Sequence, residues 1–206
     1  MLNTEIIDIK IILIGESGTG KSNLVNICCN LKFNNNTASN ISSSILEKRV
    51  EIDKIPYNLK FWDTAGQEKF RSLNNIFIKE SRICIFTYDV SRPETFEALL
   101  NYWVKSSEEI LGKEVIFGLV ANKIDLEEKV KKEEGEKFAE EIGAMFFQTS
   151  AKNDQGEFSE FVDKLVKEFL NKSCLYGWEI IEKEERISLT SNFHVKTKNK
   201  IFVDYK

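Results

Sequence analysis

The chain has 206 residues, 42% hydrophobic and 30% charged, with a net charge of −4. This length and composition predict one globular domain and a tail, with enough apolar side chains for a core. No basic excess marks a nucleic-acid binder, and the single histidine argues against a histidine-based metal centre or a Ser-His-Asp triad. The four cysteines lack metal-ligand spacing, which predicts reduced thiols in a cytoplasmic protein.

In the first half of the chain, runs rich in β-branched residues predict strands over residues 6–14, 50–55 and 58–63. Residues 22–31 have a helical period of apolar side chains. Residues 34–45, NNNTASNISSSI, are small and polar without an apolar period, which is typical of a loop.

The second half alternates strands and helices. Strands are predicted over residues 82–89, 114–121 and 144–148, and a helix over 131–142. With the first three strands, this alternation predicts an α/β fold: a six-stranded, mostly parallel sheet with helices on both faces.

Two further helices are predicted from local signals. Ser91-Arg92-Pro93-Glu94 matches a capping box with proline in the first turn. The helix that it opens places one apolar side toward the core, made of Phe96, Leu99, Leu100, Trp103 and Ile110. The last helix is strongly amphipathic, with Phe158, Phe161, Val162, Leu165, Val166 and Phe169 on one face.

The segment GESGTGKS, residues 15–22, follows the first predicted strand and opens the first helix. It matches the phosphate-loop pattern G-x-x-x-x-G-K-[ST] in the required context. Backbone N–H groups turn toward phosphate at the glycines, Lys21 adds a positive charge, and the Ser22 hydroxyl can bind Mg²⁺. The motif alone leaves an ATP-dependent kinase or ATPase open. The nucleotide-binding residues predicted here are Glu16, Ser17, Gly18, Thr19, Gly20, Lys21, Ser22 and Asn23.

Two motifs at the ends of later strands favour guanine. In NKID, residues 122–125, Asp125 can accept hydrogen bonds from guanine N1–H and N2–H₂, whereas adenine would leave it unpaired. In TSAK, residues 149–152, the Ala151 N–H can reach guanine O6. The kinase is therefore disfavoured. The base-binding residues predicted here are Asn122, Lys123, Asp125, Ser150, Ala151 and Lys152.

The segment WDTAGQEKF, residues 62–70, ends the third predicted strand. Asp63 would hold Mg²⁺ through a water, the Gly66 N–H would meet the γ-phosphate, and Gln67 would orient the attacking water as the catalytic residue. With these motifs in this order, residues 6–170 resemble the Ras superfamily of small GTPases, and LKFWDTAGQEKF and YDVS are most similar to the Rab family.

The resemblance implies a P-loop NTPase G domain over residues 1–170 and a variable tail over 171–206. It implies GTP/GDP and Mg²⁺ as ligands, slow GTP hydrolysis and a role in vesicle trafficking. Effector, exchange-factor and activating proteins would bind residues 34–45 and 65–77. A GTP- or GDP-bound scaffold that does not cycle is the alternative.

The predicted first switch loop departs from the family. Phe33 stands where the family places an aromatic ring on the guanine edge, but Asn40 stands where it places a Mg²⁺-binding threonine. Asn40 is therefore a third candidate metal ligand beside Ser22 and Asp63, and we favour a weakened switch over a harmless substitution. The chain ends KIFVDYK, without a C-a-a-X box or terminal cysteine pair, so the expected localisation is cytoplasmic, with peripheral binding to endomembranes left open.

Overall fold

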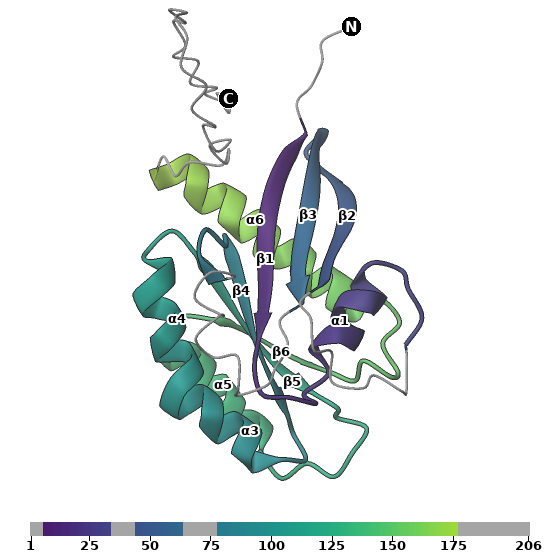
Figure 1. Ribbon diagram of the computed structural model, residues 1–206, viewed down its shortest axis with the longest axis vertical. Helices are drawn as coiled ribbons and strands as arrows, with labels where there is room; N and C mark the ends of the chain where they lie inside the picture. The colour runs from purple at the N-terminus through teal and green to yellow at the C-terminus, as the bar shows by residue number, and fades with distance from the viewer. Residues whose placement is uncertain (1–5, 34–43, 64–77, 177–206) are drawn as a thin grey trace, which may run out of the picture.

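The computed structural model describes residues 6–33, 44–63 and 78–176 (Figure 1). Within them the strands form one six-stranded sheet in the order β2-β3-β1-β4-β5-β6. Strand β2 pairs antiparallel with β3, and the other neighbouring strands are parallel. The predicted α/β architecture is confirmed. The strands are β1 (Ile7–Ile14), β2 (Ser44–Ile52), β3 (Ile55–Asp63), β4 (Ile83–Asp89), β5 (Ile116–Asn122) and β6 (Met145–Thr149).

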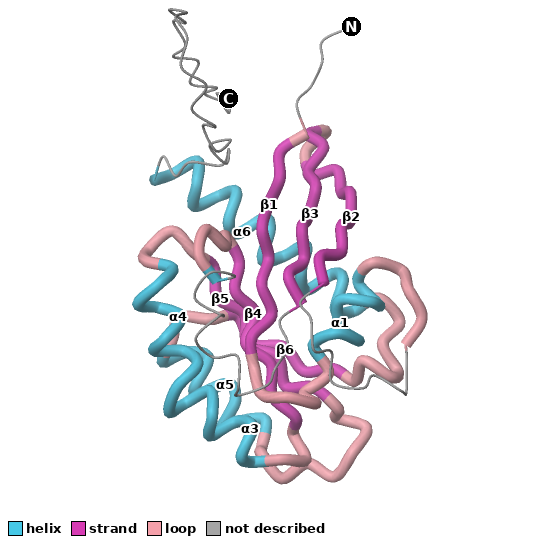
Figure 2. Tube along the Cα trace, in the orientation of Figure 1, coloured by secondary structure: helices cyan, strands magenta, loops and turns pink. Residues whose placement is uncertain are grey.

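Helices cover both faces of the sheet (Figures 1 and 2). The described helices are α1 (Lys21–Cys28), α3 (Pro93–Ala98), the π-helical turn η2 (Leu99–Trp103), α4 (Val104–Leu111), α5 (Lys132–Glu141) and α6 (Glu157–Tyr176). Helices α1 and α6 pack on one face in a first core cluster. Helices α3, α4 and α5, with η2, pack on the other face in a second cluster.

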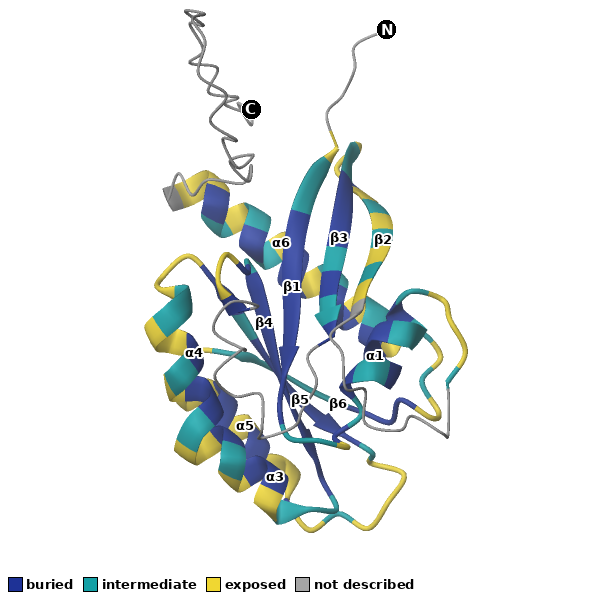
Figure 3. Cartoon of the chain, in the orientation of Figure 1, coloured by how far each residue is buried: buried dark blue, intermediate teal, exposed yellow. Residues whose placement is uncertain are grey.

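The alternation of side chains along β1 produces these two clusters. Ile9, Ile11 and Leu13 point into the first cluster, and Ile12 and Ile14 into the second. Every residue of β4 is buried, as expected of a central parallel strand covered on both faces (Figure 3). The sheet is therefore packed on both faces, and the ends of its strands position the loops that follow them.

The predicted boundaries of the second strand are wrong. Asp53 and Lys54 have φ values of 51° and 67°, and Ile52 pairs with Ile55. Positive φ at both central residues is what a two-residue type I′ hairpin requires, so residues 50–55 run through a turn. Strand β2 instead begins at Ser44, which places the end of the predicted loop 34–45 in the sheet. Exposed and half-buried residues alternate along β2, so its sequence lacks the clear apolar pattern of a buried strand.

The predicted capping box before α3 does not form. Pro93 is in the first turn as predicted, but the N-cap is Arg92 and no side chain caps the helix. The helix begins one residue later than a capping box on Ser91 requires, and the Ser91 hydroxyl donates to Asp89 Oδ1 at 2.6 Å. Leu100, predicted on the apolar side of this helix, is 44% exposed, whereas Leu99 and Trp103 of the same π-helical turn are buried.

Helix α6 buries the whole predicted apolar face, Phe158, Phe161, Val162, Leu165, Val166 and Phe169. It continues past Asn171, where the sequence predicts the tail to begin, and ends at Tyr176. All four cysteines are free thiols, and burial raises the pKa of Cys28 to about 12. No helix in the described part of the chain is both long and apolar enough to cross a bilayer.

Candidate nucleotide-binding site

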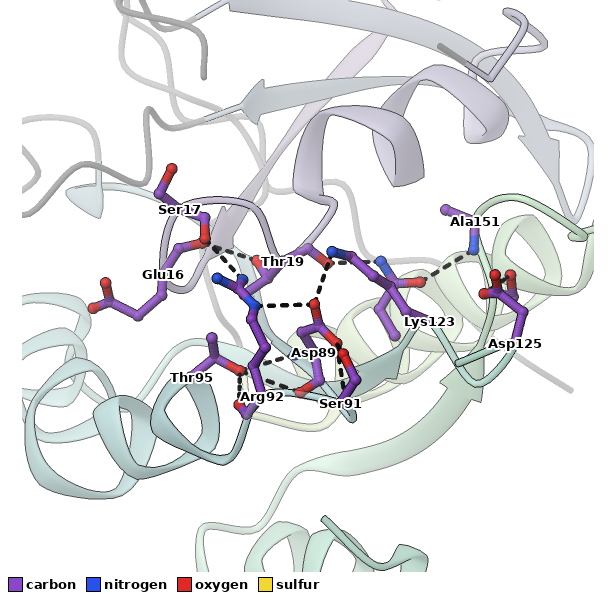
Figure 4. A network of polar contacts seen from close by, with 12 residues as sticks. Glu16, Ser17, Thr19, Asp89, Ser91, Arg92, Thr95, Lys123, Asp125 and Ala151 are labelled. Atoms are coloured by element: carbon purple, nitrogen blue, oxygen red, sulfur yellow. Dashed lines mark hydrogen bonds and ion pairs between the residues drawn. The ribbon is translucent and has the colours of Figure 1, made fainter. Parts of the chain in front are cut away.

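The residues predicted from the phosphate loop, NKID and TSAK gather at the carboxyl edge of the sheet. The loop after β1 runs into α1, and the ends of β4, β5 and β6 lie beside it (Figure 4). Open α/β sheets bind ligands at this edge, in the crevice beyond the strand ends. The segments that three separate motifs predict are therefore brought to one place.

Two glycines let the first loop approach its neighbours more closely than other residues could. Gly15 has a φ of 152°, and a Cβ there would lie 2.1 Å from the Thr87 carbonyl oxygen. Gly20 has a φ of 98°, and a Cβ there would lie 2.2 Å from Asn122 Nδ2. Both positions exclude a side chain by conformation and by space. The loop is thus a backbone cradle pressed against β4 and β5.

Lys21 lies inside this cradle. Its side chain is buried, and Nζ donates to the carbonyl oxygens of Gly15 at 2.8 Å and Glu16 at 2.9 Å. Burial lowers the pKa of the Lys21 ammonium to about 8, and the carboxylates of Asp63 and Glu16 oppose this shift. Since an anion at the loop would favour the charged form, the site is suited to phosphate.

Asn122 connects the loop to the base motifs. Its side chain is fully buried; Nδ2 donates to the Thr19 carbonyl at 2.7 Å, and Oδ1 accepts from the Ala151 N–H at 3.1 Å. Both ends of the amide are therefore used by segments far apart in the sequence. This pair of hydrogen bonds joins the phosphate loop, NKID and TSAK.

The remaining base-motif residues follow Asn122. The Ser150 hydroxyl donates to Asp125 Oδ1 at 2.5 Å. Lys123 has a φ of 67°, and its Nζ lies 2.7 Å from Asp89 Oδ2. Lys152 is exposed beside them. The Asp125 carboxylate therefore lies next to the TSAK segment, while the Ala151 N–H, predicted to reach guanine O6, donates to Asn122 Oδ1 in this structure.

Three residues at the site were not predicted: Asp89, Arg92 and Trp103. Arg92 Nη2 donates to the Ser17 carbonyl at 2.9 Å, and Trp103 Nε1 donates to Glu16 Oε1 at 2.9 Å. The signal available for Asp89 was its place at the end of a buried strand. No motif marks the two contacts to the phosphate loop.

Two of the three candidate metal ligands, Ser22 and Asp63, lie within the described residues. Ser22 is in the first turn of α1, and Asp63 is buried at the end of β3. Within the described residues no group of three His, Cys, Asp or Glu side chains could hold a metal ion. Ser22 offers a hydroxyl and Asp63 a carboxylate, both oxygen ligands of the kind that Mg²⁺ takes.

The other predicted residues are less informative. Phe33 is half-buried against the first core cluster, and Asn23 is buried in α1. Asn40, Gly66 and Gln67 lie outside the described residues.

Comparison with known proteins decides the family. A protein-family model described as the Ras family matches residues 10–171. The chain belongs to the Ras family of small GTPases. It is 40% identical over 156 residues to Ras-related protein Rab-21 of Mus musculus. The matched region covers 75% of this chain and 70% of that protein. It is 36% identical over 166 residues to Ras-related protein Rab-13 of Bos taurus, covering 80% and 81%.

This Rab-like small GTPase is a guanine-nucleotide-dependent switch that hydrolyses GTP and acts in trafficking. Ras-related protein Rab-21 of Homo sapiens is 39% identical over 156 residues, covering 75% of this chain and 69% of that protein. These relatives do not favour the alternative of a scaffold that does not cycle.

Proposed function

We propose that the carboxyl edge of the sheet holds GTP or GDP, with residues 16–23 on the phosphates and NKID and TSAK on the base. The observation that carries this proposal is the buried Asn122 amide, which is hydrogen-bonded to Thr19 and Ala151 at once. A rigid link of this kind sets the distance between a phosphate subsite and a base subsite. Asp125 is the residue that would select guanine, since adenine offers it no pair of donors.

Mg²⁺ fits the same site in chemistry. The Ser22 hydroxyl would bind it directly, Asp63 would hold it through a water, and Asn40 is the third candidate ligand. When bound, the ion would neutralise charge on the phosphates. Lys21 remains a separate, fixed charge within the loop.

Gln67 is proposed to orient the water that attacks the γ-phosphate. Gln67→Leu should lower the single-turnover rate of GTP hydrolysis at least about tenfold, because the side chain positions water and holds no phosphate. GTP affinity should be nearly unchanged. The measurement is made with and without Mg²⁺. Equal turnover in both proteins would show that Gln67 is idle and would favour the scaffold that does not cycle.

The proposed first switch depends on Asn40. A neutral amide is a longer and differently placed ligand than the threonine hydroxyl that the family uses, so we propose a weaker γ-phosphate and Mg²⁺ contact here. Asn40→Thr should slow the release of a non-hydrolysable GTP analogue in Mg²⁺ by about tenfold, the effect of one contact to a charged partner. Release in excess chelator, and release of GDP, should hardly change. Equal release rates in all conditions would show that Asn40 already does the threonine's work.

The partners proposed are effectors, exchange factors and activating proteins that contact residues 34–45 and 65–77. Support comes from the Rab relatives. We propose a cytoplasmic protein that associates peripherally with endomembranes. Pull-downs from a lysate with the GTP-analogue and GDP forms test the proposed partners, and fractionation of cells tests the proposed membrane association. Partners that prefer neither nucleotide form would contradict the switch.

A further inference from the structure

A buried carboxylate connects parts of the site that no sequence motif joins. The Asp89 side chain is 2% exposed and lies 2.7 Å from Lys123 Nζ and 3.1 Å from Arg92 Nε (Figure 4). The Ser91 hydroxyl and N–H also donate to it. Burial alone would raise the pKa of the Asp89 carboxyl, but hydrogen bonds from Lys123 and Ser91 hold it below the ordinary value. Asp89 is therefore an anion at neutral pH.

Arg92 extends this network to the phosphate loop. Its guanidinium uses Nε for Asp89 and Nη2 for the Ser17 carbonyl, at 3.1 Å and 2.9 Å. A Cβ placed on Gly18 would lie 3.3 Å from Nη2, so the guanidinium rests directly against the loop. The planar fork of arginine can serve a carboxylate and a carbonyl at the same time.

The Ser17 carbonyl is a critical point at which to hold the loop. The peptide that links Ser17 to Gly18 is planar and trans, so its C=O and N–H point in opposite directions. Fixing the carbonyl toward Arg92 therefore fixes the Gly18 N–H on the opposite side of the loop backbone. In a phosphate loop the N–H groups are the ligands, and their direction decides how well they bind.

We propose that Arg92 is a positioning residue that, anchored on Asp89, sets the direction of the Ser17–Gly18 peptide for phosphate binding. The inference rests on the proposed function and adds a residue outside its motifs. Arg92 contacts no reacting atom and acts through the loop backbone. Because Asp89 also holds Lys123, one carboxylate fixes the phosphate loop and the base motif together.

An ordinary surface pair offers a matched control. Arg82 lies 3.4 Å from Glu114 at the opposite end of β4, and these side chains are 20% and 50% exposed. Arg82→Ala removes the same charge without touching the site. Arg92 is itself 38% exposed, so the two pairs differ in their carboxylates: Glu114 is half exposed and screened by solvent, whereas Asp89 is nearly excluded from water.

The experiment compares the full chain with its Arg92→Ala, Arg92→Lys and Arg82→Ala variants. GDP release is followed with a fluorescent analogue, and the affinities for GDP and GMP are measured by titration. Arg92→Ala should release GDP about tenfold faster, the loss expected for a hydrogen bond to a charged group. Its GMP affinity should change less than about twofold, because GMP lacks the phosphates that the loop holds beyond the first.

Arg92→Lys should fall between wild type and Arg92→Ala, because an ammonium can reach Asp89 or Ser17 but does not span both as a fork. Arg82→Ala should match wild type. The positioning role would be overturned if Arg92→Ala released GDP at the wild-type rate, or if Arg92→Lys restored the wild-type rate in full. It would also be overturned if Arg92→Ala lost affinity for GDP and for GMP to the same degree. Failure of the wild-type chain to bind GDP would instead overturn the proposed function.

Discussion

The two ends of the sheet use polar residues in different ways. At the amino end, Arg82 and Glu114 form an ion pair whose side chains remain 20% and 50% exposed. At the carboxyl end, Asp89 is 2% exposed and Asn122 is fully buried, and both are held by several hydrogen bonds. The cost of burying such groups is offset only by well-made partners. At the carboxyl end these buried, hydrogen-bonded side chains connect the phosphate loop with NKID and TSAK, which is where we expect the protein to hold its ligand.

The same contrast holds for glycine. Gly20, at the carboxyl end, has no room for a Cβ, whereas Gly143, before β6 at the amino end, has nothing within 4 Å of one. Both have positive φ, 98° and 63°. An alanine would be less strained at 63° than at 98°, and only at Gly20 would its Cβ also lack space.

The largest effect expected is that of Gly20→Ala. The new Cβ would displace the Asn122 amide that joins the phosphate loop to the base motifs, so GTP affinity should fall at least about 100-fold. Gly143→Ala should leave GTP affinity unchanged and cost about 1 kcal/mol of stability from its left-handed backbone. Titration with GTP and urea unfolding measure both. Similar GTP affinities for Gly20→Ala and Gly143→Ala would contradict the difference between the two ends of the sheet.

Asp125→Asn should have the next largest effect. The substitution replaces an acceptor with a mixed donor and acceptor, so GTP binding should weaken by at least about 2 kcal/mol. Xanthosine triphosphate, whose 2-oxo group takes a donor, should gain affinity. Competition between the two nucleotides provides the measurement. Unchanged GTP affinity would mean that the base does not bind at the end of β5.

Asp89→Asn should destabilise the fold by about 1.5 kcal/mol at pH 7, because it removes the charge that Lys123 and Arg92 share. The pKa of Asp89 lies below its ordinary value of 3.8. The stabilisation is therefore complete above that value and is lost as the pH falls through the folded-state pKa. Urea unfolding of both proteins should show a smaller difference at about pH 3.5 than at pH 7. A difference that grows toward acid would contradict the charged assignment.

Arg82→Ala should have the smallest effect, less than about 1 kcal/mol on the free energy of unfolding. High salt should shrink it further, because its pair with Glu114 is exposed to solvent. The same urea titrations, with and without added salt, give the answer. A loss as large as that of Asp89→Asn would remove the distinction between the two ends of β4.

Sequence reasoning located the residues whose chemistry is written in local spacing. Lys21, Asn122 and Asp125 belong to short motifs that follow strands, and the structure brings their segments together. Arg92 was missed because its contact with Ser17 joins positions 75 apart, which no short motif can encode. Ser91 was assigned to a helix cap because the pattern S-R-P-E does not show that the helix begins one residue later, with Arg92 as its N-cap.

The strands show the same division. The buried strands β4 and β5 were predicted closely, since continuous apolar runs are unambiguous. Strand β2 was misplaced because an edge strand with exposed, charged residues such as Glu47 and Arg49 carries a weak pattern. Its turn at Asp53 and Lys54 has no glycine to announce it.

The central claim is that the carboxyl edge of the sheet selects guanine nucleotides. The most direct measurement incubates nucleotide-free protein with equal amounts of GTP and ATP, removes unbound nucleotide, denatures the protein and identifies the released nucleotide by chromatography. We expect guanine nucleotide alone, partly as GDP after hydrolysis. Equal retention of ATP and GTP, or retention of ATP, would contradict the assignment of Asn122 and Asp125 to a guanine pocket.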